Sequence, residues 1–124
     1  MYPRLKENLL GAAREAGKVF GVNSIASKAE AFAESIRKDH NRIAILPIGP
    51  RNLIWTKEHG RRKLVLQTPE SHLDVRAKFD EWTSMPWTRE LRERGVTIEL
   101  SSRTLGSKEV IWGADEDMAP PDSP

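Results

Sequence analysis

Apolar residues recur at the spacing of amphipathic helices in two segments near the start of the chain. The first segment is opened by Pro3, and its recurring apolar residues are Leu5, Leu9, Ala12, Ala13 and Ala16. Gly17 is a typical stop for that helix. The second segment spans residues 24–38, with an apolar stripe made of Ile25, Ala29, Phe32 and Ile36. The pattern therefore predicts two N-terminal helices.

Between residues 42 and 68 the pattern changes to three short runs of β-branched, aromatic and leucine residues, at 42–46, 52–57 and 62–67. Turn residues separate the last two runs, and a two-residue loop of His59 and Gly60 fits a tight hairpin. That loop fixes the register, pairing Glu58 with Arg61, Lys57 with Arg62, Thr56 with Lys63, Trp55 with Leu64 and Leu53 with Leu66. We expect a three-strand meander whose first strand either lies at an edge of the sheet or bends sharply at Pro47.

After the meander, Thr68, Pro69 and Glu70 have the order of a helix start: a hydroxyl cap, a proline and an acid. The apolar stripe of this third helix contains Val75, Phe79 and Trp82, and Ser84 marks its end. A short helix at 87–94 and two strands, at 96–101 and 108–112, complete the pattern. The sequence predicts an α+β fold, in which two N-terminal helices pack on a small antiparallel sheet made of the meander, an inserted helix and a closing strand pair.

Length and composition indicate one domain over residues 1–112 and a tail over residues 113–124. The tail contains two adjacent prolines and four acidic residues without a Lys or Arg, so we expect it to be disordered unless bound. The chain has a net charge of +2, which leaves +6 on the domain. It has no cysteine, and neither a signal-peptide layout nor a long apolar run is visible. We expect a soluble protein, cytoplasmic or in a virion, without membrane contact.

The hairpin tip gathers groups that suit phosphate chemistry. His59 and Glu58 could serve as acid and base, with Arg61 and Arg62 stabilising charge on a phosphodiester, as in metal-independent ribonucleases. Helices followed by an antiparallel sheet also resemble the architecture of small toxin ribonucleases. The alternative is a polar hairpin tip without catalysis. No spacing of His, Asp or Glu matches a metal-ligand set and no cofactor motif occurs, so we predict neither a metal nor a cofactor.

Nucleic-acid binding without catalysis is a second interpretation of the same segment. Its cations are concentrated at residues 57–63 and are Lys57, Arg61, Arg62 and Lys63. Trp55 lies among them and could stack on a base, although its predicted pairing with Leu64 favours a place in the core.

A structural or adaptor subunit is the interpretation that we favour from the sequence. Four tryptophans are many for one small core, and Trp82, Trp87 and Trp112 lie near breaks in structure where they could anchor an interface. The order of helix, three-strand meander, helix and strand resembles the small head-to-tail joining proteins of tailed phages. That resemblance implies a non-enzymatic virion connector that binds other protein subunits, as a homo-oligomer.

Overall fold

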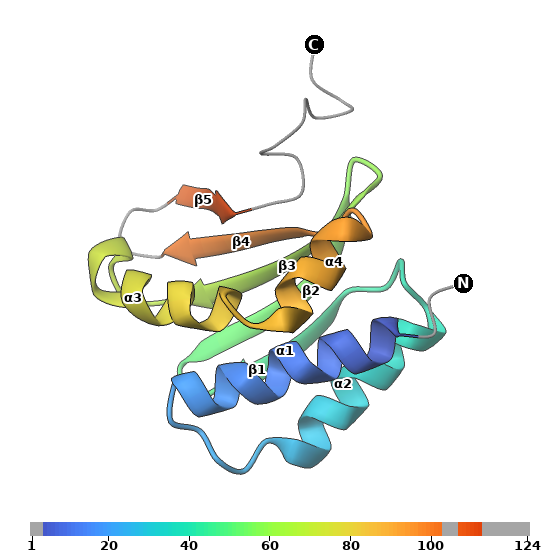
Figure 1. Ribbon diagram of the computed structural model, residues 1–124, viewed down its shortest axis with the longest axis horizontal. Helices are drawn as coiled ribbons and strands as arrows, with labels where there is room; N and C mark the ends of the chain where they lie inside the picture. The colour runs from blue at the N-terminus through green and yellow to red at the C-terminus, as the bar shows by residue number, and fades with distance from the viewer. Residues whose placement is uncertain (1–3, 103–106, 113–124) are drawn as a thin grey trace.

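The computed structural model describes residues 4–102 and 107–112, and for 107–112 it describes the backbone alone. These residues form an α+β fold, which confirms the predicted class (Figure 1). The helices are α1 (Leu5–Val19), α2 (Ala26–Lys38), α3 (His72–Thr83) and α4 (Pro86–Glu93). The strands are β1 (Ala44–Ile48), β2 (Arg51–Glu58), β3 (Arg61–Thr68), β4 (Thr97–Ser102) and β5 (Ser107–Trp112). The predicted tail, 113–124, lies outside the described residues.

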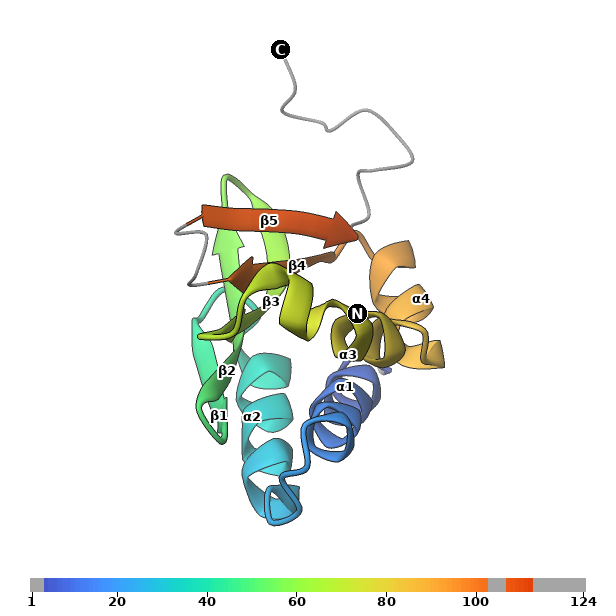
Figure 2. The same ribbon diagram turned by 90° about the vertical axis from the view of Figure 1, so that its left-hand side faces the viewer.

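The helices and the sheet form two layers, and Figure 2 shows the four helices on the same side of the sheet. Alternate strand residues point toward the helices and are almost completely buried; they are Leu46, Ile48, Leu53, Trp55, Leu64, Leu66, Ile98 and Leu100. Burying these side chains against the apolar stripes of the helices is the main stabilising contribution to such a fold. We call the opposite side of the sheet the open face, since no described helix covers it.

The hairpin between β2 and β3 has the register predicted from its turn. Glu58 pairs with Arg61, Lys57 with Arg62 and Trp55 with Leu64. His59 and Gly60 both have positive φ angles, 54° and 77°, as a two-residue hairpin loop that follows the strand twist requires. A histidine tolerates this conformation better than a β-branched residue does.

The sheet has the strand order β1-β2-β3-β4-β5 and is mixed rather than wholly antiparallel as expected. β1, β2 and β3 form the predicted antiparallel meander, whereas β4 pairs with β3 in parallel. Parallel neighbours need a long crossover connection, and α3 and α4 together provide it. β5 then returns antiparallel to β4 at the far edge, in the predicted closing pair.

Two helix ends differ from the sequence prediction. α1 continues past Gly17 to Val19, and Gly17 is needed for close packing, because a Cβ there would lie 2.7 Å from Cδ1 of Ile25. The helix stop comes four residues later at Gly21, with a φ of 72°.

The start of the third helix was also predicted too early. Thr68 belongs to β3, and the N-cap of α3 is Ser71, whose hydroxyl accepts a hydrogen bond from the Asp74 amide at 3.1 Å. Glu70 instead forms an ion pair with Arg51 at 2.8 Å, and the hydrogen bond from this guanidinium lowers the pKa of Glu70. The Thr68 hydroxyl also donates to the Glu70 carboxylate. Thr68 and Glu70 thus tie the end of β3 to the start of β2.

The tryptophans of the described side chains lie in the core. Trp82 is fully buried, donates its indole N–H to the Ala12 carbonyl at 2.8 Å and packs against Phe79 and Trp87. Trp87 is 5% exposed. Trp55 is fully buried on the helix side of the sheet, as its pairing predicted. These rings join the helices to one another rather than presenting an aromatic surface.

Candidate interaction surfaces

The hairpin tip carries the predicted phosphate-binding cations, but strand alternation divides them between the two sides of the sheet. Lys57 and Arg62 are a cross-strand pair on the helix side. Arg61 and Lys63 point to the open face, in line with the alternation along β3. The prediction of one converging cationic cluster therefore does not match the geometry.

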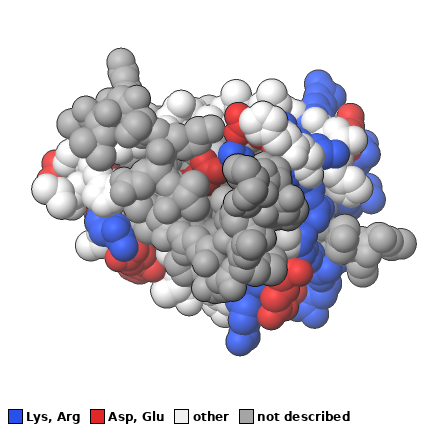
Figure 3. Space-filling view, turned by 90° about the horizontal axis from the view of Figure 1, so that it is seen from above, with Lys and Arg blue, Asp and Glu red and all other residues white. Residues whose placement is uncertain are grey.

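Interactions with neighbouring loops hold the two helix-side cations. Lys57 donates to the Asn41 side chain at 2.9 Å, and Arg62 donates to the Arg94 carbonyl at 2.5 Å. The first contact ties the hairpin to the loop after α2, and the second ties it to the end of α4. Basic residues from these segments therefore share one end of the molecule, where Figure 3 shows several Lys and Arg side chains along one edge.

Lys63 is engaged by two carboxylates on the open face. Its Nζ lies 2.7 Å from Oε1 of Glu58 and 3.0 Å from Oε2 of Glu99. Glu99 is 1% exposed, so this ion pair is a buried one. Burial works to lower the pKa of Lys63, but hydrogen bonds to Glu58 and Glu99 outweigh it and the pKa is raised. The two acids offset the charge of Lys63, which makes it a weak ligand for phosphate.

The residues of the ribonuclease interpretation lie close together in sequence but have different surroundings. His59 is exposed at the loop, whereas the carboxylate of its neighbour Glu58 is bound to Lys63. A carboxylate held in an ion pair is a poor general base, because the cation stabilises its deprotonated form. The described residues also contain no cluster of three potential metal ligands.

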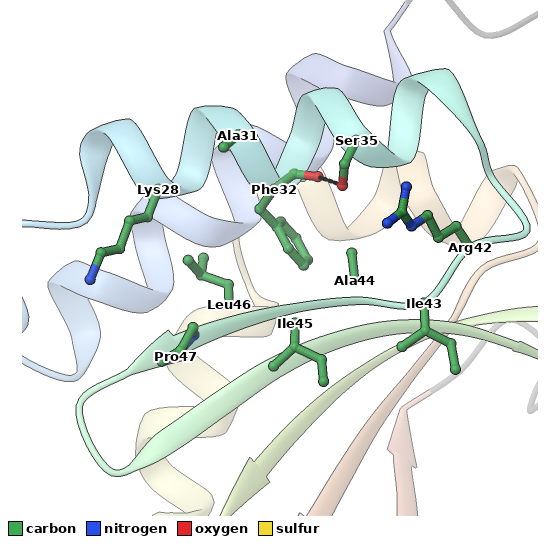
Figure 4. Close-up of a pocket in the computed structure, with 10 residues that line it drawn as sticks. All are labelled: Lys28, Ala31, Phe32, Ser35, Arg42, Ile43, Ala44, Ile45, Leu46 and Pro47. Carbon is green, nitrogen blue, oxygen red and sulfur yellow. Dashed lines mark hydrogen bonds between the residues drawn. The ribbon is translucent and has the colours of Figure 1, made fainter.

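A second surface lies at the other edge of the sheet, where β1 borders α2. A groove of about 400 Å³ runs between these two elements (Figure 4). Its apolar floor includes Phe32 of α2 and Leu46 of β1, and Lys28 and Arg42 lie at its opposite ends in the view of Figure 4.

On the other side of β1, two isoleucines are exposed. Ile43 is 60% and Ile45 is 58% exposed, and Figure 4 shows both pointing away from α2. Ile45 pairs with Ile54 of β2, which is only half-buried. We call Ile43, Ile45 and Ile54 the isoleucine stripe. It forms an apolar patch on the open face beside the free edge of the sheet.

The isoleucine stripe is not among the interface residues predicted from the sequence. The apolar run 43–48 and its proline were visible in the sequence and indicated either an edge strand or a sharp bend, and the structure places β1 at the edge. An edge strand packed on one face leaves every second residue exposed, and here those residues are Ile45 and Pro47 of β1 and Ile43 just before it. The predicted anchors Trp82 and Trp87 are buried, and Trp112 lies in β5, whose side chains are not described.

Comparison with protein families, curated proteins and solved structures gave no match.

Proposed function

We propose that this protein is a non-enzymatic interaction subunit of a multi-copy assembly, with the isoleucine stripe as its contact surface. The observation that carries the proposal is the pair Ile43 and Ile45, each more than half exposed, in the edge strand β1 and directly before it. Single exposed apolar residues are common on soluble proteins and need no explanation. A contiguous apolar patch at a free sheet edge, in contrast, is typical of surfaces that bind other proteins.

The surroundings of the stripe also support a protein contact. Pro47 continues the exposed row along β1, and it lacks the N–H group that uncontrolled strand addition would use. A partner would therefore bind mainly through side chains on the open face. The concrete form that we propose is a joining subunit like those of tailed-phage connectors, since the order of helices and strands resembles theirs.

The test is the native mass of the Ile45→Glu variant, measured by light scattering over a range of protein concentrations. We expect the wild-type chain to associate and the variant to require at least about tenfold more protein, because a buried charge opposes the contact. Leu73→Glu is a matched control, since Leu73 is 86% exposed on α3, away from the stripe. A wild-type chain that stays monomeric at every concentration, or equal association of the two variants, would contradict the proposal.

Nucleic-acid binding at the hairpin end is the second candidate. The observation that favours it is the meeting of the hairpin with the ends of α2 and α4, each of which has basic residues in its last turn. Lys57 and Arg61 are the best phosphate ligands of the tip, since Lys63 is neutralised by its two acids and Arg62 is bound to a carbonyl. Contacts of this kind bind phosphate without reading the base sequence.

We expect the double variant Lys57→Gln and Arg61→Gln to bind single-stranded nucleic acid more weakly and with a shallower salt dependence. Each lost phosphate contact reduces the slope of log K against log salt concentration by about 0.7 for a single strand. Fluorescence anisotropy at several salt concentrations measures the slope. Arg14→Gln with Lys18→Gln removes the same charge from α1 and should leave the slope unchanged. Equal slopes for the two double variants would exclude the hairpin as the binding surface.

A further inference from the structure

The groove between α2 and β1 combines an apolar floor with two cationic ends. Phe32 and Leu46 are buried at 5% and 2% exposure and form part of the floor, and the groove follows β1 from Arg42 to Pro47. Arg42 lies at one end and Lys28 at the other (Figure 4). This distribution suits an extended segment that has apolar residues in its middle and an acid at each end.

Neither cation is neutralised within the described part of the chain. Lys28 and Arg42 form no ion pair there. The acids of the same helix are already engaged: Glu30 and Glu34 pair with Lys6 of α1, and Glu34 also pairs with Arg37. The groove therefore keeps two positive charges for a ligand that comes from outside the described residues.

The chain itself contains a segment with the matching pattern. Residues 117–122 read Asp-Met-Ala-Pro-Pro-Asp, so two acids flank four apolar residues. Two residues five positions apart in a fully extended segment, with a rise of about 3.1 Å per residue, are separated by roughly 16 Å. Five residue steps along β1, from Arg42 to Pro47, cover about the same distance at roughly 3.3 Å per residue.

The reach of the chain indicates that a second copy supplies this segment. β5 ends at Trp112, on the opposite edge of the sheet from β1. The two strands are four spacings of about 4.8 Å apart, or roughly 19 Å. Asp117 comes five residues after Trp112, and five fully extended residues span about 18 Å. This span is shorter than the path from β5 across the sheet to the groove beside β1. The same segment of a neighbouring copy has no such limit.

We propose that residues 117–122 of one copy bind in the α2–β1 groove of the next, with Asp117 and Asp122 paired to the cations at its two ends. This inference rests on the proposed function, because it requires an assembly of several copies. It adds a head-to-tail contact, which closes into a ring or extends into a filament according to the rotation between neighbours. The contact adjoins the isoleucine stripe, because Ile43 and Ile45 also line the groove, although their side chains point away from α2 (Figure 4).

A charge exchange between two full-length variants tests the proposal. One variant carries Lys28→Glu and Arg42→Glu in the groove, and the other carries Asp117→Lys and Asp122→Lys in the segment. We expect each variant alone to need at least about tenfold more protein for association than the wild type, since two attractions become repulsions. An equimolar mixture should recover association, because the acidic groove of one variant matches the basic segment of the other.

The control variant carries Asp115→Lys and Glu116→Lys, which makes the same charge change just before the segment, and it should associate like the wild type apart from a general salt-dependent effect. Circular dichroism of each variant verifies that the fold is intact. Recovery in the mixture supports the proposal. A mixture that does not recover overturns it, as do charge variants that associate normally. In the latter case the proposed function stands if Ile45→Glu still weakens association, so the two failures are distinguishable.

Discussion

Replacing Lys63 with Met is expected to lower the free energy of unfolding by about 3–5 kcal/mol. The cause is Glu99, which is 1% exposed and would lose its ion-pair partner at 3.0 Å. Its other carboxylate oxygen already has no hydrogen-bond partner among the described residues. A buried carboxylate left without compensation destabilises the fold far more than an exposed pair stabilises it. Urea unfolding followed by circular dichroism at neutral pH measures the loss.

Two further variants separate this explanation from a simple loss of packing. Glu58→Gln removes the more exposed partner of Lys63 and should cost less than about 1 kcal/mol. Combining Lys63→Met with Glu99→Gln removes both charges, so it should recover part of the loss. A double variant as unstable as Lys63→Met would show that Glu99 is not the cause.

The same ion pair has a defined dependence on pH. The pKa of Lys63 is raised in the folded protein, so its stabilising contribution is fully present below the unfolded pKa of about 10.4. The contribution is lost as the pH rises through the higher folded value. The difference in stability between the wild type and Lys63→Met should therefore shrink above about pH 10.4. A difference that stays constant into this range would contradict the assignment.

Replacing Trp82 with Ala should also cost about 3–5 kcal/mol, because it opens a large cavity where α1, α3 and α4 meet. The ring is fully buried, packs on Phe79 and Trp87, and its N–H donates to the Ala12 carbonyl. If this tryptophan served as an interface anchor, its loss would weaken association and leave the unfolding midpoint unchanged. We expect the opposite, a large fall in the urea midpoint of the variant.

A matched pair of conservative variants measures the hydrogen bond within that effect. Trp82→Phe and Trp87→Phe both replace an indole by a smaller ring. The Trp87 indole N–H has no hydrogen-bond partner among the described residues, so only the first variant loses a bond. We expect Trp82→Phe to be less stable than Trp87→Phe by about 1 kcal/mol. Equal stabilities would mean that the bond to Ala12 contributes nothing.

The local structure of the hairpin could be predicted because the information lies in adjacent residues. His59 and Gly60 accept positive φ angles, and the two-residue loop that they form fixes each pair along β2 and β3. The two N-terminal helices were predicted for a similar reason, since their apolar stripes are the residues that the structure buries. In each case one short-range pattern determines the outcome.

The direction of β4 depends instead on how distant segments pack. The sequence between β3 and β4 predicts two helices. Its periodicity does not determine whether these helices form a crossover, which makes β4 parallel to β3, or a return connection, which makes β4 antiparallel to β3. In the structure β4 pairs in parallel with β3, and the crossover helices pack on α1, where Trp82 donates to the Ala12 carbonyl. That contact joins residues 70 positions apart and is invisible to local patterns.

The candidate sites were predicted less well for a related reason. The cations at 57–63 are neighbours in sequence, but alternation sends Lys57 and Lys63 to opposite sides of the sheet. The more buried ion-pair partner of Lys63 is Glu99 of β4. This pair could be predicted only if the strand order were already known. The isoleucine stripe, in contrast, follows from edge position and alternation alone.

The contacts of α1 have a consequence for how the molecule folds. α1 is the first helix in the sequence, yet Asn8 bonds to Glu90 of α4 and Ala12 accepts a bond from Trp82 of α3. During synthesis α1 can pair with α2 early, since Lys6 binds Glu30 and Glu34 of that neighbouring helix, but its contacts with α4 must wait until about 80 further residues have left the ribosome, as the separation of 82 between Asn8 and Glu90 implies. We expect the meander and the α1–α2 pair to form early from local contacts, and the docking of α3 and α4 on α1 to come last, as the step that makes folding cooperative.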